Sequence, residues 1–138
     1  MQLTRAADYG VRVMIHLASL PVGTRASLPD MAREIEVPDH FLSKVLQMLC
    51  RRRLIHSHRG AGGGFELAAD PETISMLDVV ETIEGALQLN VCLGEQGSCT
   101  RKSWCPAYLV WSEAQAAMAR VLHNTSIASL ARNVLKTS

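Results

Sequence analysis

The stretch that decides the fold is DHFLSKVLQMLCRRRLIHSHRGAGGGFEL, residues 39–67. Residues 54–58 within it predict a strand, the glycine run 60–64 predicts a hairpin loop, and residues 65–68 predict the return strand. The part before the hairpin predicts an amphipathic helix. Its apolar face carries Phe41, Val45, Met48 and Leu49, and its polar face carries His40, Ser43, Lys44 and Gln47.

Two further helices are predicted upstream of this stretch. Thr4 can cap the first, whose apolar stripe comprises Ala6, Tyr9, Gly10, Val13, Met14 and Leu17. Ser27, with Asp30 three residues later, can cap a short second helix. Three helices followed by a hairpin predict a winged helix-turn-helix domain. In that fold the third helix enters the DNA major groove, which is about 12 Å wide.

The remainder of the chain predicts three more helices and a loop. Ser75 and Gly85 bound a fourth helix, and a short final helix lies near residues 127–135. A long helix from Pro106 to about His123 is apolar nearly all round, so we expect a second copy of the chain to cover one side of it. The expected fold is mainly α with a small β-hairpin wing. The expected divisions are a DNA-binding domain at 1–85, a loop at 86–104, and a dimerisation helix with a C-terminal helix at 105–138.

Charge is distributed unevenly along these 138 residues, although the net charge is only +1. Residues 40–65 contain none of the 13 acids but five of the 14 Lys and Arg residues, namely Lys44, Arg51, Arg52, Arg53 and Arg59. One basic face on a near-neutral protein is typical of a selective polyanion binder. No apolar run reaches the roughly 18 residues of a membrane span, so we expect a cytoplasmic protein that does not enter membranes.

Three of the four cysteines, Cys92, Cys99 and Cys105, follow the spacing C-x6-C-x5-C in the predicted loop. Soft, anionic thiolates at a flexible loop suit an iron–sulfur cluster. The spacing alone leaves two alternatives open: a zinc site, or thiols that sense oxidation without a metal. Cys50 lies beside Leu49 and is interpreted as a small buried hydrophobe.

Three features together resemble a family of bacterial iron–sulfur winged-helix repressors that includes the nitric-oxide-sensing NsrR and the related IscR. These features are residues 1–10 (MQLTRAADYG), the wing sequence HRGAGGG at 58–64, and the three cysteines. The resemblance implies a homodimer on palindromic double-stranded operator DNA, with nitric oxide or an oxidant as the signal. It also implies a cluster, with [4Fe–4S] favoured and [2Fe–2S] as the alternative.

The resemblance also suggests the fourth cluster ligand. IscR-like members have a histidine where this chain has Tyr108, whereas Asp8 matches an aspartate that NsrR-like members supply from the other subunit. The implied metal ligands are therefore Cys92, Cys99, Cys105 and the partner subunit's Asp8. The same residues taken alone predict a plain ion pair between Asp8 and Arg12. Members of this family often have serine or a similar cap where this chain has Pro38, which leaves the start of the third helix and its base contacts open.

The function expected from these observations is a cluster-dependent transcriptional repressor. No catalytic constellation or nucleotide fingerprint is present, so we expect no enzyme. The alternatives are a winged-helix regulator that senses zinc or thiol oxidation, and an iron–sulfur carrier that does not bind DNA. The candidate DNA contacts are Thr4, Asp39, His40, Ser43, Lys44, Gln47, Arg51, Arg59 and Gly60.

Overall fold

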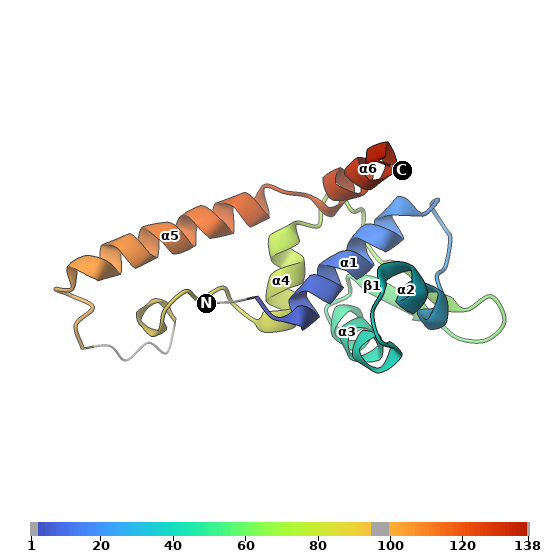
Figure 1. Ribbon diagram of the computed structural model, residues 1–138, viewed down its shortest axis with the longest axis horizontal. Helices are drawn as coiled ribbons and strands as arrows, with labels where there is room; N and C mark the ends of the chain where they lie inside the picture. Colours follow the sequence, from blue (N-terminus) through green and yellow to red (C-terminus); the bar gives the residue numbers. More distant parts are fainter. Residues whose placement is uncertain (1–2, 95–99, 138) are drawn as a thin grey trace.

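The structure is a computed structural model that describes residues 3–94 and 100–137. Helices dominate it, with one antiparallel hairpin, as the sequence predicts (Figure 1). In chain order the elements are α1 (Arg5–Ser19), α2 (Leu28–Ile35), α3 (Asp39–Arg51), β1 (Ile55–His58), β2 (Gly64–Leu67), α4 (Met76–Glu84), the short 3-10 helix η1 (Val91–Leu93), α5 (Pro106–His123) and α6 (Ile127–Thr137).

Helix α1 lies at the centre of the protein and packs against α3, α4 and α6. Its residues Val13 and Met14 are fully buried, and they share one apolar core with buried residues of α3 and α4. The crossing of α1 and α4 is close: a methyl group on Gly10 would lie 3.0 Å from Cγ1 of Ile83. Interiors are densely packed, so a glycine at this position allows the two helices to approach.

Side-chain caps fix where three of the helices begin. The hydroxyl of Thr4 accepts from the N–H of Ala7 at 3.2 Å, and that of Ser27 accepts from the N–H of Asp30 at 3.2 Å. Ser75 and Asp78 form a reciprocal capping box at the start of α4. Each cap satisfies a backbone N–H that has no partner inside its helix. All three caps are therefore predictable from local sequence.

The predicted apolar face of α3 is partly wrong. The buried stripe is Leu42, Val45, Leu46 and Leu49. Phe41, by contrast, is 46% exposed, and Met48 is only half-buried. The i, i+3, i+4, i+7 spacing starts one residue later than expected, and Phe41 instead makes an edge contact with Tyr9 at 6.3 Å between ring centroids. Helix α3 begins at Asp39 although proline occupies the cap position, because the carbonyl of Pro38 accepts from the N–H of Leu42.

The wing comprises β1, β2 and the connecting loop, residues 59–63. Its register pairs Ile55 with Leu67 and His58 with Gly64. Ala26, between α1 and α2, extends this pairing by exchanging two backbone hydrogen bonds with Phe65, at 2.9 and 2.8 Å. Gly64 makes the approach possible, because a methyl group there would lie 2.7 Å from the carbonyl oxygen of Ala26. The loop before α2 is thus attached to the wing.

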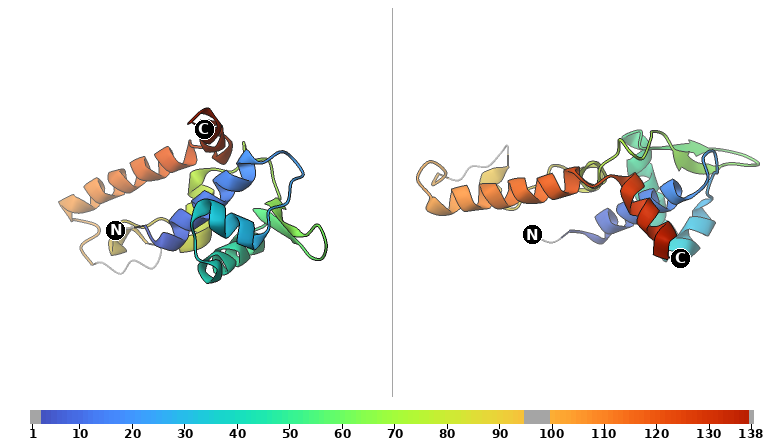
Figure 2. Two further views of the ribbon diagram at one scale, coloured as in Figure 1. Left: turned by 45° about the vertical axis from the view of Figure 1, so that its right-hand side comes forward. Right: turned by 90° about the horizontal axis from the view of Figure 1, so that it is seen from above.

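Helix α5 extends away from the other helices, and the wing lies at the opposite end of the protein (Figures 1 and 2). Across the described residues, α5 has no buried position, and Leu109 is 71% exposed. The other strongly exposed apolar residues of α5 are Val110, Trp111 and Val121. In the part of the chain that the structure describes, no helix is both long and apolar enough to cross a membrane.

Candidate DNA interface and cluster loop

The polar face of α3 is exposed along its whole length. Asp39, His40, Lys44, Gln47 and Arg51 are exposed, and Ser43 is half-exposed. This face is opposite the buried stripe that holds α3 against α1, so it is free to meet a partner. The polar face predicted from helical spacing, with His40, Ser43, Lys44 and Gln47, is thus accessible, and the contact of these residues with DNA stays a prediction.

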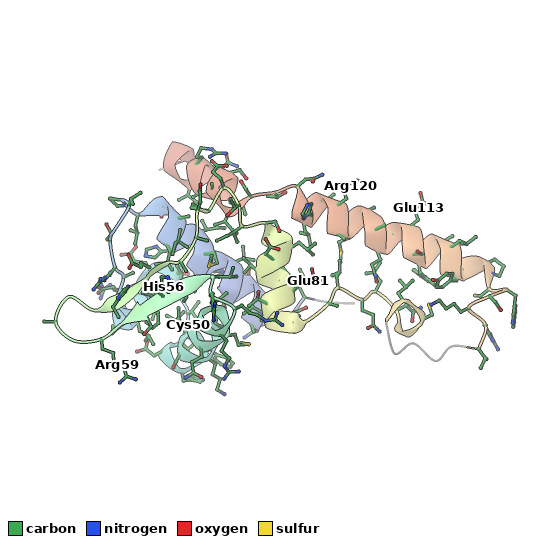
Figure 3. The ribbon with its side chains drawn as sticks, turned by 180° about the vertical axis from the view of Figure 1, so that it is seen from behind. Cys50, His56, Arg59, Glu81, Glu113 and Arg120 are labelled. Atoms are coloured by element: carbon green, nitrogen blue, oxygen red, sulfur yellow. The ribbon has the colours of Figure 1, made fainter. Side chains whose placement is uncertain are left out.

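A groove separates this face from the wing. It is lined by Ser43, Gln47 and Arg51 of α3 on one side and by Ser57 and Arg59 of the wing on the other. Arg59 extends from the wing loop (Figure 3), and exposed Gly60 follows it with a φ of +84°. Hydroxyl and guanidinium donors on both walls, with the Gln47 amide on the α3 wall, suit a phosphate backbone. Ser57 was missed by sequence reasoning, because strict strand alternation would turn it inward with Ile55, whereas it is exposed.

The wing is less uniformly basic than the sequence indicates. Glu66 follows directly after the acid-free stretch, and register places it opposite His56. Its Oε1 accepts a hydrogen bond from Nε2 of His58 at 2.5 Å and lies 3.9 Å from Nε of Arg25. His58 is therefore engaged within the wing, and the positive charge available to a partner comes from Arg59 and from α3.

Two further candidates, Thr4 and Asp8, lie at the start of α1. Thr4 is the exposed N-cap, and the side chain of Asp8 is 57% exposed. Within this single chain, Oδ2 of Asp8 lies 3.0 Å from Nη2 of Arg12, the ion pair that the spacing predicts. The same guanidinium donates from Nη1 to the carbonyl of Ile35, at 3.1 Å. Asp8 is thereby connected to the end of α2, immediately before the turn into α3.

The cysteine loop is described at both ends. Cys92 is buried in η1, and Cys105 is the half-buried N-cap of α5. Helix η1 packs against α5, and the N–H of Leu89 donates to Oε1 of Gln115 at 2.9 Å, so both segments are held together. Cys99 lies outside the described residues. Cys92 and Cys105 are free thiols, and in the described residues the Cys105 side chain makes no capping hydrogen bond.

This donor set fits an iron–sulfur cluster chemically. Its two described members are soft sulfur ligands on segments that pack against each other, and cationic side chains lie close by in sequence: Arg101 over the Trp104 ring and Lys102 over the Tyr108 ring. Among the described residues, no three Cys, His, Asp or Glu side chains gather around a common point. The proposed set needs Cys99 and a residue from a second subunit, so one described chain cannot complete it.

Cys50 differs from these cysteines. It lies on α3 at the floor of the groove beside the wing, half-buried against the core rather than fully buried as expected. Burial raises the pKa of the Cys50 thiol above its ordinary value, because desolvation disfavours the thiolate. A raised pKa lowers the fraction of thiolate, the form that binds metals, which fits a packing residue.

Helices α2 and α3 joined by a tight turn, with a wing beside an exposed polar helix face, define a winged helix-turn-helix DNA-binding protein. Comparison with known proteins agrees and identifies the family. Residues 3–133 match the Rrf2 family, described as iron-dependent transcriptional regulators, and the chain belongs to that family.

Two relatives are described as HTH-type transcriptional regulators. An HTH-type transcriptional regulator of Mycobacterium tuberculosis is 35% identical over 98% of this chain and 84% of its own length. The HTH-type transcriptional regulator NsrR of Shouchella clausii is 33% identical over 96% of this chain and 90% of its own length. These likenesses fit a transcriptional regulator rather than an enzyme.

Solved structures show the same fold. The oxidized form of CymR from Staphylococcus aureus superimposes with a TM-score of 0.76 at 30% identity, covering 95% of this chain and 96% of that one. T. potens IscR superimposes with a TM-score of 0.79 at 23% identity, covering 97% and 88% respectively, and at that identity it supports the fold alone.

Proposed function

We propose that this protein is a homodimeric repressor of palindromic operator DNA whose binding depends on an iron–sulfur cluster, with [4Fe–4S] favoured over [2Fe–2S]. The ligands are Cys92, Cys99, Cys105 and the partner subunit's Asp8, and the signal is nitric oxide or an oxidant. The observation that carries the proposal is the packing of η1, with Cys92, against the helix that Cys105 begins. Residues 1–85 bind DNA, 86–104 hold the cluster, and 105–138 dimerise.

Dimerisation is supported by α5. Its exposed apolar side chains, which include Leu109, Val110 and Val121, would form an unusually large apolar surface on a lone chain. A second copy offers the same surface, so two α5 helices can cover each other in an isologous interface. Helix α5 would then bring the cysteine loop of one subunit towards α1 of the other.

DNA binding is assigned to the exposed face of α3 and to the wing. His40, Ser43, Lys44 and Gln47 meet base edges and phosphates in the major groove, while Arg59 and Gly60 meet the adjacent backbone or minor groove. Thr4, Asp39 and Arg51 complete the proposed contact set. Both recognition helices of a dimer bind only when their separation matches one DNA turn, about 34–36 Å.

Contacts around Arg12 indicate how ligation of Asp8 can reach α3. When bound, the cluster would supply a covalent link from the cysteine loop to α1 of the partner. Asp8 that serves as a ligand no longer neutralises Arg12, whose other contact is the carbonyl of Ile35. Arg12 also lies 5.8 Å from the Tyr9 ring centre, and Tyr9 contacts Phe41 beside His40. A change at Asp8 therefore shifts contacts that border the turn and the first residues of α3, and loss of ligation lowers operator affinity.

The test is an absorption spectrum of protein purified without oxygen, recorded before and after addition of a nitric oxide donor. DNA binding is measured in parallel on a duplex that the cluster-loaded protein selects from a random pool. Visible absorption that bleaches together with DNA binding supports the proposal. A protein that stays colourless after anaerobic reconstitution contradicts it.

Thiol-oxidation sensing is the second candidate function, favoured by one observation. The solved CymR structure, at 30% identity, is of an oxidized form. In this alternative Cys92, Cys99 or Cys105 would respond directly, without a cluster, or hold zinc. A colourless protein whose DNA binding changes reversibly with peroxide and thiol reductant would select this account, and stoichiometric zinc would select the metal variant. An iron–sulfur carrier predicts a coloured protein with no selected duplex.

A further inference from the structure

Arg25, in the loop between α1 and α2, contacts the wing at two residues, Gly62 and Glu66. Its Nη1 donates a hydrogen bond to the carbonyl of Gly62 near the wing tip, at 3.2 Å. Its Nε lies 3.9 Å from Oε1 of Glu66 on β2. The next residue, Ala26, pairs with Phe65 through two backbone hydrogen bonds. The side chain of Arg25 thus reaches the wing loop, and the backbone of Ala26 reaches the adjacent part of β2.

Glu66 is the point at which these contacts meet. The oxygen that faces Arg25 also accepts from His58 on β1, at 2.5 Å. The Glu66 side chain is only a quarter exposed, so salt screens its interactions less than those of a surface carboxylate. One carboxylate therefore joins β1, β2 and the loop before α2.

These contacts bracket Arg59 in the chain. His58 immediately precedes it, and the Gly62 carbonyl follows three residues later. Within this segment Gly60 and Gly62 have positive φ values of +84° and +76°, a conformation that glycine adopts without strain but does not enforce. An unrestrained loop of this composition would lose conformational entropy on binding DNA.

We propose that Arg25 is a positioning residue for the wing: it fixes Gly62 and Glu66 so that Arg59 faces the groove beside α3. This inference rests on the proposed contact of Arg59 with DNA. Arg25 then acts on DNA affinity through Arg59 and not through its own charge.

The matched test is a double-mutant cycle on the selected duplex described above, with the cluster-loaded protein. Arg25→Ala is expected to weaken binding three- to tenfold in the wild-type background and to have little effect when Arg59→Ala is present. Arg33→Ala is the control, since Arg33 pairs with Asp30 on α2 and makes no described contact with the wing. Its effect should add to that of Arg59→Ala. If the effects of Arg25→Ala and Arg59→Ala also add, Arg25 contacts DNA independently and the inference is wrong.

Glu66 gives a second test with opposite expected signs. A carboxylate near DNA repels phosphates, so electrostatics alone predicts that Glu66→Ala tightens binding. The positioning role of Arg25 predicts that Glu66→Ala weakens DNA binding, because Arg25 and His58 both lose the carboxylate that they share. Tighter binding by Glu66→Ala therefore contradicts the inference.

The outcomes separate this inference from the proposed function. If Arg59→Ala weakens binding but Arg25→Ala binds like wild type, the positioning role alone fails. If Arg59→Ala leaves affinity and its salt dependence unchanged, the wing contact fails and the positioning role fails with it. Arg25 and Glu66 are outside the hydrophobic core, so each variant is expected to fold, and circular dichroism would test this.

Discussion

The backbone N–H of Thr4 donates a hydrogen bond to Oε1 of Glu84, 2.6 Å away. This contact joins the N-cap of α1 to the last residue of α4, across 80 residues of sequence. The first turn of α1 also carries Asp8, and α4 packs against α5. The start of α1 is therefore placed by the element that neighbours the proposed dimer helix.

Replacement of Glu84 is expected to loosen the start of α1. Glu84→Ala removes a charge-assisted hydrogen bond at an exposed site, so the free energy of unfolding should fall by about 0.5–1 kcal/mol. Because the proposed ligand Asp8 lies one turn away, the proposed cluster should also be lost faster in air. Urea unfolding and the decay of visible absorption measure the two effects. Glu34→Ala, on α2, is the control, and equal decay rates in both variants would contradict the link.

Replacement of Asp8 should uncouple the cluster from DNA binding. The Asp8–Arg12 pair is exposed, so Asp8→Ala should change stability by less than about 0.5 kcal/mol. Operator affinity should become weaker and insensitive to nitric oxide. Fluorescence anisotropy on the selected duplex measures this, with Asp30→Ala, which breaks the exposed pair with Arg33, as the control. Unchanged affinity with a stable cluster would show that Asp8 is not a ligand.

The cysteines should separate into two groups. Cys105→Ser is expected to abolish visible absorption after anaerobic reconstitution, whereas Cys50→Ser should leave it intact. The raised pKa of Cys50 means that less thiolate is present at any given pH than for an ordinary cysteine. Mass spectrometry after brief alkylation at pH 8 should therefore find Cys50 modified more slowly than a free cysteine in an unstructured peptide. Loss of colour in Cys50→Ser would overturn its assignment as a packing residue.

A charge on α5 should break the proposed dimer. Leu109→Glu places a carboxylate on a side chain that is 71% exposed in the single chain, so the isolated chain should tolerate it. Sedimentation velocity is expected to show a smaller species than the wild type. Val22→Glu is the matched control, because Val22 is fully exposed in the loop after α1. A Leu109→Glu protein that sediments like the wild type would exclude α5 as the interface.

Local sequence determined much of the fold. Three helix starts are marked by Thr4, Ser27 and Ser75. In each, a side-chain oxygen accepts from the backbone N–H three residues further on, so the signal lies within four consecutive residues. Phe41 was assigned to the wrong face because apolar character says nothing about which of two neighbouring stripes meets the core. Tertiary contact with Tyr9 decides it.

The candidate site was less accessible to sequence reasoning. The exposed face of α3 follows from helical spacing, and it was predicted correctly. The interactions of Glu66 with Arg25 and His58 were not predicted, because no local sequence pattern links residues on a loop and two strands. The cysteine spacing indicates candidate ligands but does not identify the metal. Asp8 is a candidate ligand only through the resemblance to NsrR-like repressors. The roles of all of these residues stay predictions.

Helix α5 has no buried residue in a described single chain, and this affects more than assembly. Apolar surface that is covered only by another copy stabilises the fold by mass action, so the thermal midpoint should rise with protein concentration. In the proposed dimer, dilution would therefore also leave the helix that Cys105 begins less well ordered. For the proposed cluster-dependent repressor, the abundance of the chain would then set the fraction that can carry a cluster, before any signal arrives.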